Sequence, residues 1–182
     1  MNTITKSLLG FLSLFSVGSC YKPPEGVQPV TDFDMSRYLG KWYEIARLDH
    51  SFERGLSQVS AEYTLRDDGG INVVNRGFSV EKNEWKEAKG RGYYVGDPKT
   101  GHFKVSFFRP FYGAYIIFEL DKNGYQYAFI SGGNKSYLWL LSRTPKISDV
   151  LIQRFILQAK NRGFDTDKLV YVEQKSLEEI TQ

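Results

Sequence analysis

The sequence predicts an all-β fold: an eight-stranded antiparallel up-and-down β-barrel with one C-terminal α-helix packed outside it and a short final strand. Three observations support this prediction. Short segments with two-residue alternation recur between clusters of turn residues. Aromatic residues make up 15% of the 182 residues, which favours strands. The apolar spacing then changes to that of a helix near residue 148, and closing the eight strands into a barrel would leave no unpaired edge.

The first three strands are predicted over residues 42–48, 58–66 and 71–78. In the second, apolar side chains occupy every other position, which is typical of a half-buried strand. These positions are Val59, Ala61, Tyr63 and Leu65. The sequence 67–70, Asp-Asp-Gly-Gly, is a strong tight-turn signal, so the second and third strands are predicted to form a hairpin.

The fourth strand, predicted over residues 85–95, has unusually small residues on one face. Ala88, Gly90, Gly92 and Tyr94 share this face. Small inward-facing residues are expected to leave room inside a barrel. The fifth strand follows from the alternation over residues 103–107. Residues 114–120 are almost wholly apolar, which indicates a sixth strand covered on both faces.

The last two barrel strands are predicted over residues 125–131 and 137–143, after a hairpin turn at residues 121–124. Ser148 is a suitable helix N-cap, and Gly163 is a suitable C-terminal stop. Between them lies an apolar stripe at three- and four-residue spacing, formed by Leu151, Ile152, Phe155, Ile156 and Ala159. A final short strand is predicted over residues 169–174.

The N-terminus predicts export and lipidation. Residues 1–19 have the pattern of a signal peptide, and their apolar run is too short to span a bilayer. Residues 17–20, Val-Gly-Ser-Cys, resemble a lipobox, in which the cysteine receives acyl chains after cleavage. The alternative is an ordinary signal peptide with a chance cysteine at its end. Cys20 is the only cysteine, so it has no disulfide partner within the fold, and this favours lipid attachment.

These features predict four segments. Residues 1–19 are the signal peptide, and residues 20–32 are the lipidated Cys20 with a flexible, proline-containing tether. Residues 33–176 form the barrel and its helix, and residues 177–182 form a loose tail. Tyr21 follows the cysteine where an aspartate would usually signal retention in the inner membrane. The lipobox resemblance therefore implies the outer membrane, with the protein on its periplasmic face.

Three residues are predicted to close one end of the barrel. Trp42 follows Gly40 at the head of the first strand, and Arg143 ends the eighth. A guanidinium over an indole ring gains about 0.5–2 kcal/mol. This constellation resembles the signature of the lipocalins, in which an arginine packs across the tryptophan at the closed end.

A closer resemblance is to the bacterial outer-membrane lipocalins, which are related to apolipoprotein D. It is carried by the segments 37–47, 63–70, 104–113 and 137–145, so it spans nearly the whole mature chain. The usual middle signature of the family is degenerate here, at residues 125–128. The resemblance implies binding of fatty acids or lysophospholipids for lipid storage or transport in envelope maintenance. No cofactor is expected, and the two histidines do not have the spacing of metal ligands.

An apolar lumen with few polar groups suits an amphipathic lipid, whose tail would lie inside and whose headgroup would lie at the mouth. By alternation, twelve residues are predicted to face the lumen as ligand-pocket candidates. They are Val59, Ala61, Tyr63, Val73, Asn75, Ala88, Tyr94, Val105, Phe107, Ile116, Phe118 and Trp139. For each residue taken singly, packing within the barrel core is as good an explanation as contact with a ligand.

The same alternation places Glu44 inside the barrel, where a carboxylate needs a partner or a raised pKa. A cation near the barrel floor, or Arg143, would supply the partner. Such a structural role is favoured over binding of a lipid headgroup. Tyr43 and Ile45 are predicted to face outward beneath the helix. The aromatic loop Phe108–Tyr112 is open to three interpretations: a lid, a membrane-facing patch or a dimer surface. A homodimer is expected from family analogy alone.

The remaining classes of function have little support. The net charge of +3 is small and no basic run is present, so a nucleic-acid partner is not expected. Catalysis would need a nucleophile beside a base, and no Gly-x-Ser-x-Gly motif exists. A haem or tetrapyrrole carrier would need His50 or His102 to point inward, whereas surface loop positions are the simpler expectation. A structural envelope protein is the other alternative.

Overall fold

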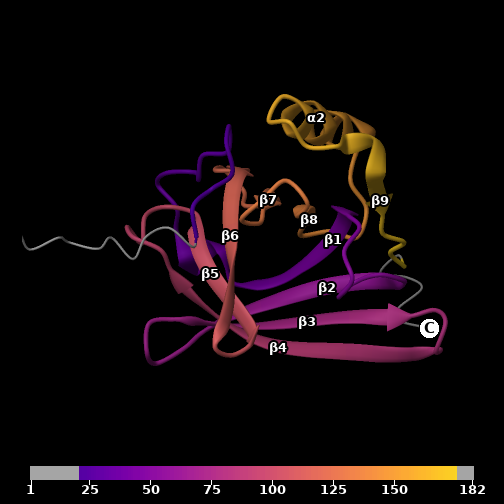
Figure 1. Ribbon diagram of the computed structural model, residues 1–182, viewed down its shortest axis with the longest axis horizontal. Helices are drawn as coiled ribbons and strands as arrows, with labels where there is room; N and C mark the ends of the chain where they lie inside the picture. Colours follow the sequence, from indigo (N-terminus) through magenta and orange to yellow (C-terminus); the bar gives the residue numbers. More distant parts are fainter. Residues whose placement is uncertain (1–20, 176–182) are drawn as a thin grey trace, which may run out of the picture.

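The structure is a computed structural model that describes residues 21–175 (Figure 1). The predicted signal peptide, Cys20 and the predicted tail at 177–182 lie outside the described residues. The barrel strands are β1 (Gly40–Leu48), β2 (Leu56–Leu65), β3 (Ile71–Ser79), β4 (Glu84–Tyr94), β5 (His102–Phe108), β6 (Phe111–Leu120), β7 (Tyr127–Ser131) and β8 (Leu138–Ser142). The other elements are α1 (Met35–Tyr38), α2 (Asp149–Lys160), the 3₁₀ turn η2 (Thr166–Lys168) and β9 (Leu169–Tyr171).

The predicted fold class is confirmed: β1 to β8 form a closed antiparallel up-and-down barrel. Each strand pairs with the next, and β1 pairs with both β8 and β2. The pairing of β1 with β2 runs only from Gly40↔Tyr63 to Tyr43↔Ser60. Beyond that point β1 separates from β2 and its last residues, from Ala46 to Leu48, pair with β9. The segment after β9 lies between the two strands there: the N–H of Val172 donates to the carbonyl of Ile45, and the N–H of Gln58 donates to the carbonyl of Glu173, at 2.9 and 2.7 Å.

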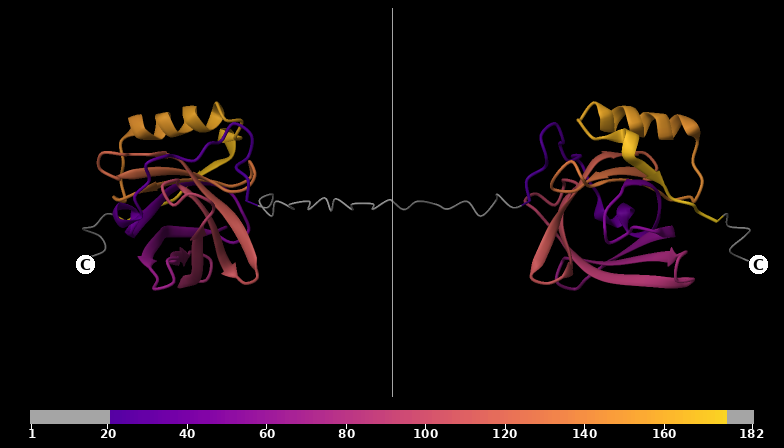
Figure 2. Two further views of the ribbon diagram at one scale, coloured as in Figure 1. Left: turned by 90° about the vertical axis from the view of Figure 1, so that its left-hand side faces the viewer. Right: turned by 45° about the vertical axis from the view of Figure 1, so that its right-hand side comes forward.

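Helix α2 lies outside the barrel, along one side of its wall (Figure 2). The Ser148 side chain accepts a hydrogen bond from the backbone N–H of Leu151, as expected of an N-cap. Phe155 and Ala159 are fully buried against the outer wall. Neither α-helix within residues 21–175 is long and apolar enough to cross a bilayer.

The barrel therefore separates two apolar cores. One fills the lower lumen and includes Trp42, Tyr63 and Phe103. The other lies between the outer wall and α2, where Ile45 is buried and Tyr43 packs at the edge, as the alternation predicts.

Residues 21–32 differ from the expected flexible tether. They form no helix or strand, yet they pack on the barrel. The Val27 side chain is buried in the core beneath α2. The backbone of Val30 donates to the carbonyl of Ile117 and accepts from the N–H of Gly101, at 2.8 and 2.9 Å. Proline excludes regular structure here, but it does not prevent the segment from packing through its two valines.

Candidate ligand-binding site

The closed end of the barrel brings together the three residues predicted there. The Arg143 guanidinium carbon lies 3.9 Å from the centre of the Trp42 ring. Its nitrogens donate to the carbonyls of Lys41 and Arg37, each at 2.8 Å. Gly40 has a φ of 88°, which favours glycine, and a side chain there would approach Arg143. Arg143 thus ties the end of β8 to the start of β1 across the indole.

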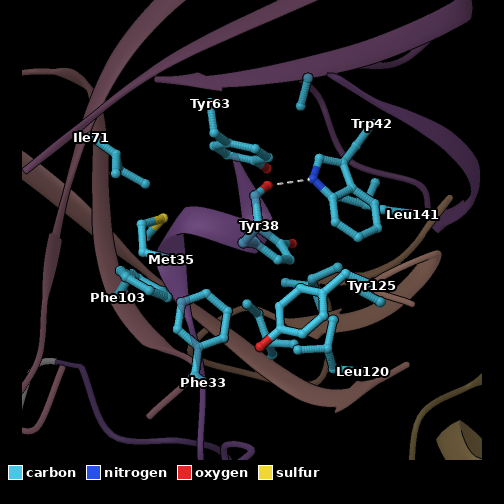
Figure 3. Close-up of a cluster of buried hydrophobic side chains, with 14 of the residues drawn as sticks. Phe33, Met35, Tyr38, Trp42, Tyr63, Ile71, Phe103, Leu120, Tyr125 and Leu141 are labelled. Carbon is cyan, nitrogen blue, oxygen red and sulfur yellow. Dashed lines mark hydrogen bonds between the residues drawn. The ribbon is translucent and has the colours of Figure 1, made fainter. Parts of the chain in front are cut away.

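The short helix α1 enters the lumen and covers the other side of Trp42. The Trp42 indole N–H donates to the carbonyl of Tyr38 at 2.8 Å, as Figure 3 shows. Tyr63 and Phe33 pack against Tyr38, and Phe103 and Tyr125 pack in turn against Phe33. The lower lumen is therefore filled by aromatic side chains. A ligand has to lie above this layer.

Three tyrosine hydroxyls form a chain across the filled layer. The Tyr38 and Tyr63 hydroxyls lie 2.7 and 2.9 Å from the Tyr115 hydroxyl. Burial raises the pKa of all three tyrosines, so each remains a neutral hydrogen-bonding group. Tyr38 and Tyr115 were not among the predicted lumen residues, because no local sequence pattern marks this contact between distant segments.

Most of the predicted lumen residues do face the lumen. Ala61, Tyr63 and Val73 belong to its buried core, and Tyr94, Val105 and Trp139 pack against that core. Val59 is buried at the position expected from the alternation with Ala61. Asn75 pairs with Ala61 and Ala88, and its side-chain oxygen is buried without a hydrogen-bond partner within the described chain. Whether these residues contact a ligand stays a prediction.

The small residues of β4 do not leave empty space at every position. A side chain at Gly90 would collide with the ring of Phe107, and one at Gly92 would collide with Ile71. The expected room at these two positions is instead occupied by larger neighbours. Higher on the strand, Ala88 is exposed, and 43% of Phe107 is exposed. The upper lumen therefore opens to solvent at these two residues.

The prediction for Ile116 and Phe118 was wrong. Both are buried outside the barrel wall, in the core beneath α2. Their neighbours Tyr115 and Ile117 belong to the lumen core. Because residues 114–120 are apolar on both faces, alternation could not determine which face points inward.

A buried polar cluster, formed by Glu44, Arg47, His50, Glu53 and Trp139, lies above the aromatic layer. Arg47 Nη1 donates to Glu44 Oε1 at 2.8 Å, and Nη2 donates to the backbone carbonyl of Glu53 at 2.8 Å. The Trp139 indole N–H donates to Glu53 Oε2 at 3.1 Å. These contacts join the loop between β1 and β2 to β1 and β8.

The partner of Glu44 is therefore Arg47, and the suggestion of Arg143 was wrong. Strict alternation would place Arg47 outside, but β1 has an irregularity between Glu44 and Ala46. Ile45 and Ala46 both face the outer core as a result, and Arg47 turns inward. Burial and the nearby Glu53 carboxylate raise the pKa of Glu44 well above its usual value, although Arg47 opposes this shift.

The two histidines have different environments. The His50 side chain is buried, so its expected position in a surface loop was wrong. Its Nε2 lies 3.0 Å from Glu53 Oε2 but is poorly aligned for a hydrogen bond, and its Nδ1 has no partner among residues 21–175. His102 Nε2 instead donates to the backbone carbonyl of Tyr21 at 2.7 Å. Within the described part of the chain, no group of side chains is arranged to hold a metal ion.

A concavity of about 690 Å³ lies on the outer wall of β1 to β4. It is lined by apolar side chains such as Val74 and Trp85, and by charged ones of both signs such as Arg76 and Glu87. Arg76 and Glu87 form an ion pair at 2.7 Å across this surface. Because it carries charges of both signs, this outer surface suits an acyl chain less well than the apolar lumen does.

A barrel with a tryptophan and arginine at its closed end and an apolar lumen defines a lipocalin. The chain belongs to this class, since the model of the lipocalin-like domain matches residues 33–174. It is 60% identical to the outer membrane lipoprotein Blc of Vibrio cholerae, over 91% of this chain and 98% of that protein. It is 49% identical to the Blc protein of Escherichia coli K12, over 88% of this chain and 91% of that protein.

More distant similarities are found in both sequence and structure. Mouse apolipoprotein D is 28% identical over 88% of this chain and 85% of its own length. The solved structure of insecticyanin from the tobacco hornworm matches with a TM-score of 0.66 and 21% identity, covering 85% of this chain and 87% of that one. These matches establish the barrel, while the choice of ligand depends on the residues of this lumen.

Proposed function

We propose that the barrel binds the acyl chain of a fatty acid or lysophospholipid, and that the protein stores or transports such lipids in envelope maintenance. The observation that carries this proposal is the division of the lumen. Aromatic side chains fill its lower part together with Val73 and Val105, the inward-facing Ala88 and Phe107 are exposed above them, and polar side chains cluster near Trp139. A single acyl chain matches this arrangement, with its headgroup at the mouth.

The protein is assigned to the outer membrane, because the relatives at 60% and 49% identity are named outer membrane lipoproteins. We further propose that Cys20 carries the acyl anchor and that the barrel lies on the periplasmic side. Several acyl chains on one cysteine would give stable attachment, whereas a single chain would not. The proposed role is binding rather than catalysis.

Charged substitutions in the upper lumen are expected to abolish lipid binding. Phe107→Asp and Trp139→Asp each place a carboxylate where the acyl chain would lie, so the affinity should fall at least about tenfold, equivalent to about 1.4 kcal/mol. The measurement is a titration of lipid-stripped protein lacking residues 1–20 with a fluorescent fatty acid. The Phe107 variant is the sharper test, because this side chain is already partly exposed and its loss should not impair folding.

Trp85→Asp is the matched control, since Trp85 is an exposed aromatic residue on the outer wall. It should bind the probe as the unmodified protein does. Thermal unfolding of each variant separates a loss of binding from a loss of fold. Saturable binding that survives the substitutions at both Phe107 and Trp139 would contradict the placement of the ligand in the lumen.

A further inference from the structure

The hairpin between β5 and β6 ends in two large apolar side chains that face solvent. Phe108 is 76% exposed and Phe111 is 71% exposed. Their rings lie 6.4 Å apart and are nearly parallel, with an angle of 4° between the planes. The two residues are cross-strand partners beyond an irregularity in the pairing after Val105, and both rings lie at the tip of the hairpin. A paired and exposed aromatic surface of this kind commonly marks a contact site.

The described chain begins on the wall of the same hairpin. The carbonyl of Tyr21 accepts the hydrogen bond from His102 Nε2, and Lys104 Nζ lies 5.5 Å from the centre of the Tyr21 ring. His102 and Lys104 both belong to β5. Tyr21 directly follows Cys20, the proposed site of acylation. Consecutive Cα atoms are about 3.8 Å apart, so an acylated Cys20 would bring this wall of the barrel close to the lipid.

The distance from the anchor to the aromatic tip is also short. Phe108 follows Lys104 by four residues, which corresponds to about 13 Å along a strand. The hairpin from residue 102 to residue 118 contains no aspartate or glutamate, while Lys104 and Arg109 are cationic. The hairpin therefore combines apolar rings with positive charge, which suits the interface of a bilayer that contains anionic lipids.

We infer that the β5–β6 tip, formed by Phe108 and Phe111, inserts into the interface of the bilayer that carries the acyl anchor. This inference rests on the proposed acylation of Cys20. With two points of attachment on one hairpin, the barrel has a fixed side toward the membrane. It does not hang freely at the end of a tether, and this agrees with the packing of residues 21–32 on the barrel.

The test uses the full acylated lipoprotein with a single reporter at the tip. Acylated Cys20 has no free thiol, so Phe108→Cys or Phe111→Cys introduces the only reactive one. Each variant is labelled with an environment-sensitive dye and reconstituted in vesicles of phosphatidylethanolamine and phosphatidylglycerol. Leu157→Cys is the matched control, because Leu157 is 58% exposed on α2, away from the hairpin. All three positions are exposed, so the substitutions should leave folding intact, which thermal unfolding checks.

Tip labels are expected to shift their emission to the blue and to be quenched by nitroxide-labelled lipids several-fold more strongly than the label at Leu157. Equal, water-like spectra at all three positions would overturn the inference. A blue shift without quenching by lipid, which grows with protein density, would also overturn it, since a second copy of the chain would then cover the tip.

The intact mass of each labelled protein separates this inference from the proposed anchor. If the mass shows that the chain is acylated but the tip labels have water-like spectra, only the insertion of the tip is contradicted. If the mass shows no acyl chains, the proposed anchor is contradicted, and so is the insertion of the tip, which rests on it. The fluorescent fatty acid titration is independent of both results.

Discussion

Trp42→Ala is expected to lower the free energy of unfolding by about 3–5 kcal/mol, the usual range for removing a large buried aromatic side chain. Trp42 is fully buried, packs between Tyr38 and Arg143, and its N–H is satisfied by the Tyr38 carbonyl. The substitution would open a cavity at the closed end and leave the Arg143 guanidinium without its ring. Chemical denaturation followed by circular dichroism measures the change.

Trp85→Ala is the matched control, because it removes the same side chain from an exposed position. It should cost less than about 1 kcal/mol. The fraction of Trp42→Ala protein that remains folded should still bind lipid, since Trp42 lies below the aromatic layer. A variant with unchanged stability and no binding would mean that Trp42 contacts the ligand and does not close the barrel.

Arg47→Met should destabilise the protein by a similar amount, about 3–5 kcal/mol, because it removes one partner of a buried ion pair. Arg47 is 2% exposed. The substitution would leave Glu44 buried without its cation, and would release the backbone carbonyls of Glu53 and Leu56 that Arg47 holds. The same denaturation experiment measures this loss.

Arg54→Met provides the control for Arg47. Arg54 also pairs with a carboxylate, Asp49, at 2.7 Å, but both side chains are largely exposed. Exposed ion pairs contribute at most about 1 kcal/mol, so this variant should unfold almost as the unmodified protein does. Equal stabilities of the Arg47 and Arg54 variants would show that the buried cluster does not hold the loop.

The fold could be predicted from the sequence because each barrel strand has a local signal. The turn at residues 67–70 and the alternation at Val59, Ala61 and Tyr63 determine both the strand boundaries and the inward face. The change of period at Ser148 marks the helix in the same way. These signals depend on neighbouring residues alone, so no knowledge of distant contacts was needed.

The parts that were not predicted depend on departures from alternation or on contacts across the barrel. The irregularity in β1 moves Arg47 inward, and no residue in the segment marks it. Because β6 is apolar on both faces, the sequence did not indicate that Ile116 points outward. The burial of His50 arises from the folding of a loop onto β8, where Trp139 meets Glu53 across 86 residues of sequence. Such contacts produce no periodic pattern in the sequence.

The central claim is that the upper lumen holds one single-chain lipid. Mass spectrometry of the molecules extracted from protein purified from its native membrane tests this most directly. The expected result is one fatty acid or lysophospholipid per barrel, which is greatly reduced in Phe107→Asp protein and unchanged in Trp85→Asp protein. Recovery of a haem-like pigment, or of membrane phospholipids in equal amounts from all three proteins, would contradict the claim.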